Sequence, residues 1–391
     1  MSRRQQTATA SPEWGLCGVY ALTVLARTTV IALIPVMAYS TLGTAQHVSE
    51  LYFGSSLVGI ATSLLLPNLL ARVGRWRVFF AAALAGAASA AALASQTLLG
   101  LALGLVLHVL MVLTFENVMS LYVLQFVPRR SLSTFEPRRV LLAGITYGVG
   151  PALGAWLTEF AGAWAPLVLS AACAVAVPLV IMRLKPRAES KTSAPSLKGP
   201  RRSDARLFLS QPRLRLAWIL AAIRASWWFM FIVYTPIFAV SHGLGASTGG
   251  IMIAIGSALL VLAPFWGRVV KRTGMRRLLL GAYVICGFGT IATGLLAAPF
   301  PKGASAMLLF AASAMSAIDG IGNLPYLRAV RPHQRTDMTP IYNTYRDVAQ
   351  VAPAGFFAIL LAFLPLPSVF IASGVLMVLA SGFCLYLPRR F

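Results

Sequence analysis

The sequence predicts an all-α membrane protein in which twelve transmembrane helices form two pseudo-symmetric six-helix bundles. Composition is the first of three observations behind this prediction. Of the 391 residues, 58% are hydrophobic and only 11% are charged, whereas about a quarter of the residues in a soluble domain are charged. The second observation is that apolar runs near the ~20 residues of a spanning helix recur along the chain. The third is a repeat of rare features in the two halves.

The apolar runs predict twelve spans, and the loops between them alternate in charge. The spans are expected at residues 15–39, 50–70, 78–96, 98–126, 139–161, 163–183, 215–240, 249–268, 278–298, 304–327, 339–361 and 366–387. Loops on one side carry arginine and lysine repeatedly, whereas loops on the other side hold only Lys302. The positive-inside rule therefore places both termini in the cytoplasm of a multi-pass protein of the cell (inner or plasma) membrane. Since the net charge of +23 lies largely in these loops, we expect the lipid bilayer, and no nucleic acid, as a partner.

One long connection, residues 184–213, separates the two halves. It is rich in Lys, Arg, Ser and Pro and has no apolar period, which indicates a flexible cytoplasmic linker. The expected domains are therefore an N-terminal six-helix bundle at residues 1–183 and a C-terminal six-helix bundle at residues 214–391.

Four pairs of features recur in the two halves at offsets between 197 and 203 residues. They are Arg27 and Arg224, Gly74 and Gly274, Pro151 and Pro353, and Glu116 and Asp319. Such a spacing indicates an internal repeat, in which two parallel bundles are related by an axis along the membrane normal. A site is then expected between the bundles, near the middle of the membrane.

Two of these repeated pairs place four charges inside predicted spans. An ion at membrane depth costs a few kcal/mol on insertion scales and is kept where it faces protein, water or a ligand. We expect Arg27 to pair with Glu116, and Arg224 with Asp319, because pairing lowers the cost of burying each charge. Two interpretations stay open: the carboxylates exchange protons, or the pairs only brace the helices.

Polar and aromatic residues at helical spacing from these charges are the expected contacts of a small-molecule substrate. The arginines would hold an anionic part of the substrate, and the rings of the seventh span an aromatic part. The expected substrate contacts are Arg27, Arg224, Trp227, Trp228, Phe231, Asn323, Tyr342, Arg346 and Gln350.

The residue patterns of soluble enzymes are missing from the sequence. The four cysteines each stand alone in an apolar run and form neither a disulfide framework nor a metal-ligand cluster. No phosphate loop, zinc spacing or nucleophile elbow occurs. We therefore expect no catalytic residue, no metal and no cofactor, and an ion gradient rather than ATP as the energy source.

The loop after the second span resembles a motif of the major facilitator superfamily, G-x-L-A-D-R-x-G-R-K/R. The residues that fit are Leu69, Arg72, Gly74 and Arg75, while Pro67 and Ala71 replace the first glycine and the aspartate. A second copy keeps Gly267, Arg272, Gly274 and Arg276, with Lys271 in place of the aspartate. The resemblance implies that these residues act in conformational change. It also puts the latch of the outward-facing state in doubt, since the family's aspartate helps to form it.

The fifth span is similar to the G-P-x-x-G-G motif of the superfamily's drug and proton antiporters. Gly150, Pro151 and Gly154 match it, and Ala155 stands in place of the last glycine. Glycines four residues apart let helices approach closely, and proline loosens the backbone. Tight packing alone and a part in coupling are both open interpretations. The fourth span lacks the arginine that these antiporters have.

The resemblance covers the whole chain at the level of the fold and implies a secondary active transporter, not an enzyme. We expect proton-coupled efflux of a small anionic or aromatic metabolite, siderophore or drug, by a monomer with alternating access. The proton gradient drives it, and Glu116 and Asp319 carry the protons. One alternative is an organic-anion or phosphate-ester exchanger or importer, which the arginines of the first and seventh spans also resemble. A non-transporting membrane sensor or assembly factor is the alternative of another class.

Overall fold

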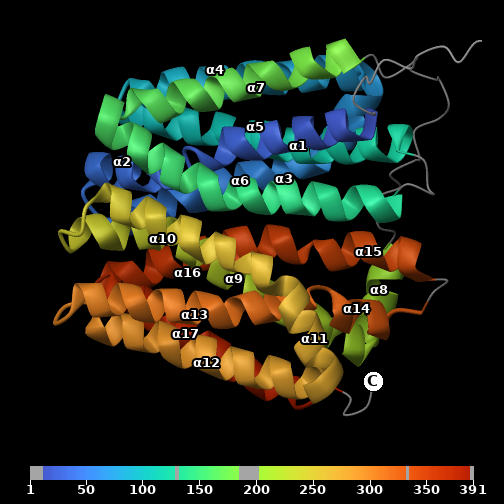
Figure 1. Cartoon of the computed structure of the whole chain (residues 1–391), viewed down its shortest axis with the longest axis vertical. Coiled ribbons are helices and arrows are strands. Elements are labelled where there is room, and N and C mark those ends of the chain that lie inside the picture. The colour runs from blue at the N-terminus through green and yellow to red at the C-terminus, as the bar shows by residue number, and fades with distance from the viewer. Residues whose placement is uncertain (1–11, 128–131, 185–201, 332–333, 388–391) are drawn as a thin grey trace, which may run out of the picture. The chain divides into compact units, whose positions relative to one another are not determined.

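The computed structural model of the chain describes residues 12–127, 132–184, 202–331 and 334–387, which are helical apart from short connections (Figure 1). Twelve helices or runs of helices are long and apolar enough to cross a membrane. Eight of these spans are single helices: α3 (Ala45–Val73), α4 (Arg75–Ala94), α5 (Leu98–Phe126), α6 (Leu132–Ala161), α7 (Trp164–Leu184), α9 (Pro212–Ser241), α12 (Met275–Leu296) and α17 (Pro367–Cys384). Each of the twelve overlaps one predicted span, so the predicted fold class of an all-α membrane protein with twelve spans is confirmed.

The other four spans are interrupted, which the sequence analysis did not expect. The first consists of α1 (Pro12–Thr28) and α2 (Leu33–Leu42), and the tenth of α13 (Pro301–Ile321) and α14 (Leu324–Ala329). The eighth consists of α10 (Ala246–Ala258), a 3₁₀ turn at Leu259–Leu262 and α11 (Ala263–Thr273), and the eleventh of α15 (Arg335–Asn343) and α16 (Tyr345–Phe363). In the first span, α1 ends one residue after the charged Arg27. In the tenth span, α13 ends two residues after the charged Asp319.

The break in the tenth span has a local cause in the sequence. Gly322 adopts φ 56° and ψ −128°, a conformation that glycine reaches freely and that strains other residues. Pro325 lies in the first turn of α14, where a missing backbone N–H removes no helical hydrogen bond. The run Gly322-Asn323-Leu324-Pro325 therefore ends one helix and starts the next.

The break in the first span lies against the glycines of α6. A Cβ atom at Gly150 would overlap the side chain of Thr28, and one at Gly154 would overlap the backbone carbonyl of Thr29. Only glycine lets α6 come so close to the end of α1. The close approach expected from the glycine spacing is therefore present, while a part of Gly150, Pro151 and Gly154 in coupling stays a prediction.

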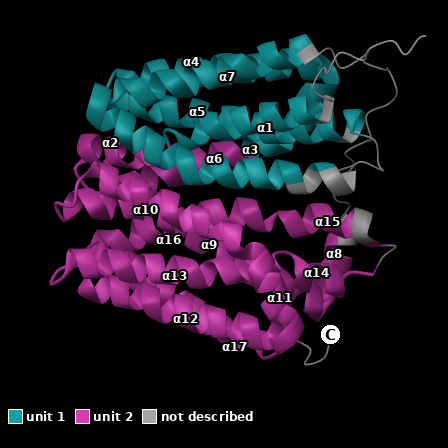
Figure 2. Ribbon diagram, in the orientation of Figure 1, with its two compact units in different colours: residues 1–30, 61–195 teal, residues 31–60, 196–391 magenta. Residues whose placement is uncertain are grey.

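By packing, the chain divides into two compact units, residues 1–30 with 61–195 and residues 31–60 with 196–391 (Figure 2). In the first unit, α4 packs along α5 and α7, and α1 packs along α6 and α7. In the second unit, α12 packs against α13 and α17, and α9 against α10 and α16. This division differs from the repeat-based domains at residues 1–183 and 214–391, which stay a prediction.

Residues 31–60 belong to the second unit through α2 and the first half of α3. The hydroxyl oxygens of Ser49 and Tyr234 lie 2.6 Å apart, and both residues are fully buried. The rings of Tyr52 and Phe229 meet edge to face, with centroids 6.1 Å apart. The helix α3 therefore contributes its first half to one unit and its second half to the other.

Part of the predicted linker is helical. α8 (Arg202–Ser210) precedes α9 and buries Phe208 in a cluster with Leu214, Tyr326 and Met338. The helix is only nine residues long, too short for an apolar period to stand out in a basic segment. Residues 185–201 of the predicted linker lie outside the described residues.

The two motif loops have the same backbone geometry at their glycines. Gly74, between α3 and α4, has φ 91° and ψ 147°, and Gly274, between α11 and α12, has φ 82° and ψ 150°. Arg75 Nη1 donates to Gln125 Oε1 at 2.6 Å, which ties the start of α4 to the end of α5. Shared geometry at matched positions fits the predicted repeat. The conformational roles of these loops, including those of Arg72, Gly267 and Arg272, stay predictions.

Candidate functional site

The second unit contains the predicted ion pair between Arg224 on α9 and Asp319 on α13. Arg224 Nε lies 3.3 Å from Asp319 Oδ1, and the two side chains are only 10% and 21% exposed. A charge so far from water is strongly stabilised by an opposite charge beside it. The two residues are 95 positions apart in the sequence and lie on different helices. The prediction that they form an ion pair is confirmed.

The second oxygen of the same carboxylate is held by Trp228. Its indole Nε1 donates a hydrogen bond of 2.6 Å to Asp319 Oδ2. Because Trp228 follows Arg224 by four residues, one face of α9 supplies both partners of the carboxylate. The indole ring is itself fixed, since it meets the rings of Trp227 and Phe231 edge to face at centroid distances of 5.4 and 5.5 Å.

The guanidinium of Arg224 has further partners where the tenth and eleventh spans break. Its Nη2 lies 3.5 Å from both Asn323 Oδ1 and Tyr345 Oη, and the ring of Tyr345 is 5.9 Å from its Cζ. Tyr342 Oη donates to Asn323 Oδ1 at 3.2 Å, and Arg346 Nε to Tyr345 Oη at 3.3 Å. Asn323 and Tyr345 reach the arginine from the interruptions between α13 and α14 and between α15 and α16.

One helix end also favours a cation at this place. Asp319 lies in the last turn of α13, where unpaired backbone carbonyls leave the helix end partially negative. The interruptions supply the side chains of Asn323 and Tyr345 around Arg224, and the end of α13 adds a partial negative charge. The sequence contained a signal for the break in the tenth span, because a glycine, an asparagine and a proline within four residues indicate a turn.

The first unit contains the other predicted pair, Arg27 with Glu116. Arg27 Nη1 donates to Glu116 Oε1 in an ion pair between α1 and α5. These side chains are 24% and 46% exposed, more than those of the second pair. The ring of Tyr147 on α6 lies 4.9 Å from Arg27 Cζ. The pairing prediction is confirmed here too, in a more open setting.

Each arginine thus has a tyrosine ring beside its guanidinium, which the sequence analysis missed. Tyr147 and Tyr345 are 198 residues apart, within the range of offsets found for the other repeated features. This offset is the sequence signal for the tyrosine pair, but with 11 tyrosines in the chain one such offset is not distinctive. The duplicated feature is therefore an arginine, a carboxylate and a tyrosine.

Two residues of the expected aromatic contact set are buried in helix packing. Trp227 is 1% exposed and Phe231 is fully buried, with their rings stacked at a centroid distance of 5.1 Å. Trp227 Nε1 donates to Thr290 Oγ1 on α12 at 2.9 Å. Phe231 fills the space beside Gly256 of α10. In this conformation, Phe231 presents no surface to a substrate, and Trp227 meets open space only as one of the residues that line the apolar cavity described below. The packing therefore favours Trp228 among the three as a contact near the ion pair.

The predicted contacts on the eleventh span fall into two groups. Tyr342 is buried, stacked on Tyr326 at a centroid distance of 4.0 Å, and joined to the Arg224 cluster through Asn323. Arg346 and Gln350 are exposed, and Arg346 contacts the cluster at the hydroxyl of Tyr345. Substrate contact by all of these residues stays a prediction.

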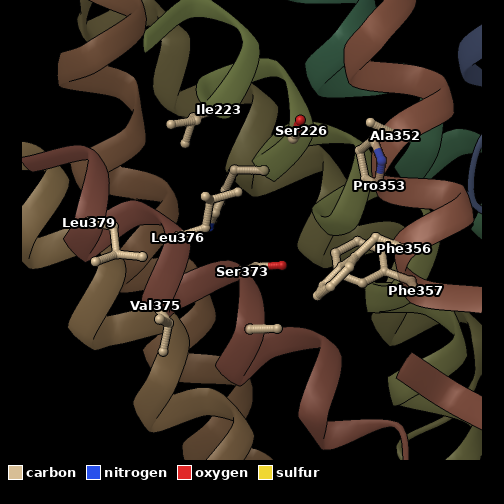
Figure 3. Close-up of a pocket in the computed structure, with 12 residues that line it drawn as sticks. Ile223, Ser226, Ala352, Pro353, Phe356, Phe357, Ser373, Val375, Leu376 and Leu379 are labelled. Carbon is tan, nitrogen blue, oxygen red and sulfur yellow. The ribbon is translucent and has the colours of Figure 1, made fainter. Parts of the chain in front are cut away.

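A cavity of about 480 Å³ opens between α9, α16 and α17 of the second unit. Figure 3 shows Phe356 and Phe357 on one side of it and Val375, Leu376 and Leu379 on the other. The hydroxyls of its two serines donate to backbone carbonyls of their own helices. The lining is therefore apolar and includes neither residue of the Arg224 pair. No group of three or more metal-ligating side chains occurs among the described residues.

The comparisons with known proteins agree with the fold. The sequence profile described as the Major Facilitator Superfamily matches residues 16–354, which is well over half of the chain. No curated protein matches the sequence.

Several solved structures share the fold at low sequence identity. A bacterial homologue of the iron transporter ferroportin, in an inward-facing state, has a TM-score of 0.75 and 13% identity, with 98% of this chain and 100% of that chain covered. A POT family transporter in complex with a thioalcohol conjugated peptide has a TM-score of 0.74 and 11% identity, with 95% of each chain covered. The nucleoside transporter NupG has a TM-score of 0.71 and 14% identity, with 97% and 100% covered. At these identities, the likeness shows the fold alone.

Proposed function

Because the chain belongs to the Major Facilitator Superfamily and is a secondary transporter, we propose that it exports a small organic molecule in exchange for protons. The proposed substrate carries an anionic or an aromatic part. The observation behind this proposal is that each unit holds an arginine paired with a carboxylate inside membrane-spanning helices. Members of this family are transporters rather than enzymes, which also argues against the non-transporting alternative.

The pairs support coupling because three species compete for the same groups. A carboxylate either accepts a proton or pairs with its arginine, and an arginine released by protonation has free N–H groups. A guanidinium binds a carboxylate or a phosphate through two parallel hydrogen bonds. A substrate that occupies either member of a pair changes the balance between protonation and ion pairing at the other member, so substrate binding and protonation are linked at these groups.

Export is supported by the motif of the fifth span. Gly150, Pro151 and Gly154 resemble the signature of drug and proton antiporters, and both glycines lie against the break of the first span, next to Arg27. The structural relatives include a homologue of an iron transporter, a nucleoside transporter and a transporter in complex with a conjugated peptide, so the proposed substrate class rests on the site and not on them.

An organic-anion or phosphate-ester exchanger or importer is the second candidate. One membrane-embedded arginine in each unit favours it, because a guanidinium group can bind an anion without any proton. The two candidates differ in their energy source, since exchange of one anion for another needs no pH gradient.

The orientation and assembly of the transporter are part of the proposal. We place both termini on the cytoplasmic side of the cell membrane, on the strength of the basic loops. We also propose that a monomer is sufficient for transport, because the arginine, carboxylate and tyrosine of each cluster all come from one chain.

Transport in proteoliposomes under an imposed pH gradient tests these proposals. The purified full chain would be assayed with candidate organic acids, phosphate esters and aromatic drugs, with and without a protonophore. Export in exchange for protons predicts flux that a protonophore abolishes, and that Glu116→Gln or Asp319→Asn weakens. Flux that persists without a gradient and requires an anion on the opposite side would favour the exchanger instead.

A further inference from the structure

We infer that the two charged pairs do different work, and that Glu116 is the carboxylate that takes up and releases the coupling proton. Asp319 would be a fixed counter-ion that keeps Arg224 in place, with Trp228 as the positioning residue that holds it. This division rests on the proposed function, because it assigns to one pair the coupling role proposed above for both.

The first argument is the number of partners that each carboxylate has. Both oxygens of Asp319 are engaged, one by Arg224 and the other by the indole N–H of Trp228. Over the part of the chain that the structure describes, Glu116 has one partner for its side chain, which is Arg27. Protonation of Asp319 would therefore disturb two charge-assisted contacts in a buried place, whereas protonation of Glu116 disturbs one.

The second argument is how closely each carboxylate is covered by protein. The Glu116 side chain is 46% exposed and the Asp319 side chain 21% exposed. A coupling carboxylate must exchange its proton in each transport cycle, and the less covered side chain needs less rearrangement of its surroundings to do so.

The third argument concerns the arginine left behind after protonation. Without Asp319, Arg224 would still face Asn323 and Tyr345, so the C-terminal cluster holds its cation in several ways. Without Glu116, Arg27 would keep only the face of Tyr147 among the described residues. Protonation thus changes the surroundings of the arginine more in the first unit than in the second.

The groups that can influence Glu116 are few. The helix α5 packs on α1 and α4, and α1 brings Arg27 and Tyr20 while α4 carries charges only at its start, Arg75 and Arg77. His108 lies two turns before Glu116 on α5 itself. Arg27 is therefore the one charged neighbour in contact with the carboxylate among the described residues.

Chemical labelling of the two carboxylates tests the division without a known substrate. Dicyclohexylcarbodiimide adds to protonated carboxyl groups that this apolar reagent can reach within the membrane, and mass spectrometry of peptides from the purified full chain gives the extent at each position. We expect Glu116 to be modified increasingly as the pH falls, and Asp319 to react about tenfold more slowly, as one additional hydrogen bond implies. Equal reaction of both residues, or faster reaction of Asp319, would overturn the inference, and this comparison needs no variant.

Two tryptophan variants test the positioning role of Trp228. W228F removes the indole N–H from Asp319 and keeps an aromatic ring, so the modification of Asp319 should rise about tenfold. W227F is the matched control, because the indole of Trp227 binds Thr290 and not the carboxylate, and it should leave the reactivity of Asp319 unchanged. Size-exclusion profiles and thermal denaturation verify that both variants are folded. The same rise in both variants, or a rise in neither, would contradict the role.

The labelling result is separate from the transport result. Modification needs no gradient and no substrate. Flux that proves independent of protons would therefore contradict the proposed function, whatever reactivities are measured. Proton-driven flux with equal reactivities would contradict only the inference that Glu116 and Asp319 have different roles.

Discussion

Two tyrosines sit beside the membrane-embedded arginines in different ways. Tyr147 offers Arg27 the face of its ring at 4.9 Å, whereas Tyr345 also accepts hydrogen bonds at its hydroxyl from Arg224 Nη2 at 3.5 Å and Arg346 Nε at 3.3 Å. A cation over a ring is stabilised by roughly 0.5–2 kcal/mol, depending on how far it is desolvated. The ring is therefore the main contribution of Tyr147, and the hydroxyl matters at Tyr345.

We predict that Tyr147→Phe is nearly neutral and that Tyr345→Phe lowers the free energy of unfolding by about 1 kcal/mol. Both variants keep the ring, but only the second removes a buried acceptor of arginine hydrogen bonds. Thermal denaturation of the purified proteins in one detergent checks the order. Tyr147→Leu, which removes the ring as well, is the control that should destabilise the first site. A larger loss from Tyr147→Phe than from Tyr345→Phe would contradict this account.

Removal of the arginines should have unequal effects. Arg224→Ala leaves Asp319 as a buried charge without its counter-ion, which destabilises by about 3–5 kcal/mol. Arg27→Ala leaves Glu116 without its partner in a less covered place, so the loss of stability should be smaller than at Arg224. Thermal denaturation again measures the difference.

A matched double variant separates charge from packing. Arg224→Leu combined with Asp319→Leu removes both charges, so it should be more stable than Arg224→Ala alone. If the double variant is the less stable of the two, the ion pair is not the reason for the loss.

At the scale of the helices, glycine positions decide how closely two helices can pack. The helix α6 carries glycines with opposite surroundings. A Cβ atom at Gly154 would overlap the Thr29 carbonyl, whereas one at Gly144 would have no atom within 4 Å. The spacing of glycines in the sequence does not distinguish these two positions, but the structure does.

We predict that Gly154→Ala destabilises the protein by about 1–3 kcal/mol, because a backbone carbonyl cannot move aside as a flexible side chain can. Gly144→Ala, on the same helix, should be neutral or slightly stabilising, because alanine favours a helix over glycine. Thermal denaturation of the two variants gives the comparison. Equal melting temperatures would show that α6 does not lie against the break as described.

The elements that the sequence predicts well are those set by hydrophobicity and charge alone. Twelve spans and both arginine–carboxylate pairs follow from the cost of placing polar groups in lipid. The interruptions do not, because an apolar run looks the same whether its helix is continuous or broken. The sequence also does not predict the burial of Trp227 and Phe231, because helical spacing indicates which residues share a face of a helix but not which neighbouring helix packs on that face.

At the scale of the whole molecule, the asymmetry of charge between loops predicts the orientation in the membrane. Two exposed lysines make this testable on one segment. Lys271 lies at the end of α11 and Lys302 at the start of α13, with α12 as the one span between them. If α12 crosses the membrane, these two positions face opposite sides, and the positive-inside rule puts Lys271 in the cytoplasm.

We predict that a membrane-impermeant maleimide added to intact cells labels the K302C variant and not K271C. Once the cells are opened, both should react. The background is expected to be low, because the native cysteines Cys17, Cys173, Cys286 and Cys384 are all buried. Labelling of K271C in intact cells, with K302C protected, would invert the orientation. Labelling of both positions from outside would mean that α12 does not cross the membrane, and the twelve-span topology would then be wrong.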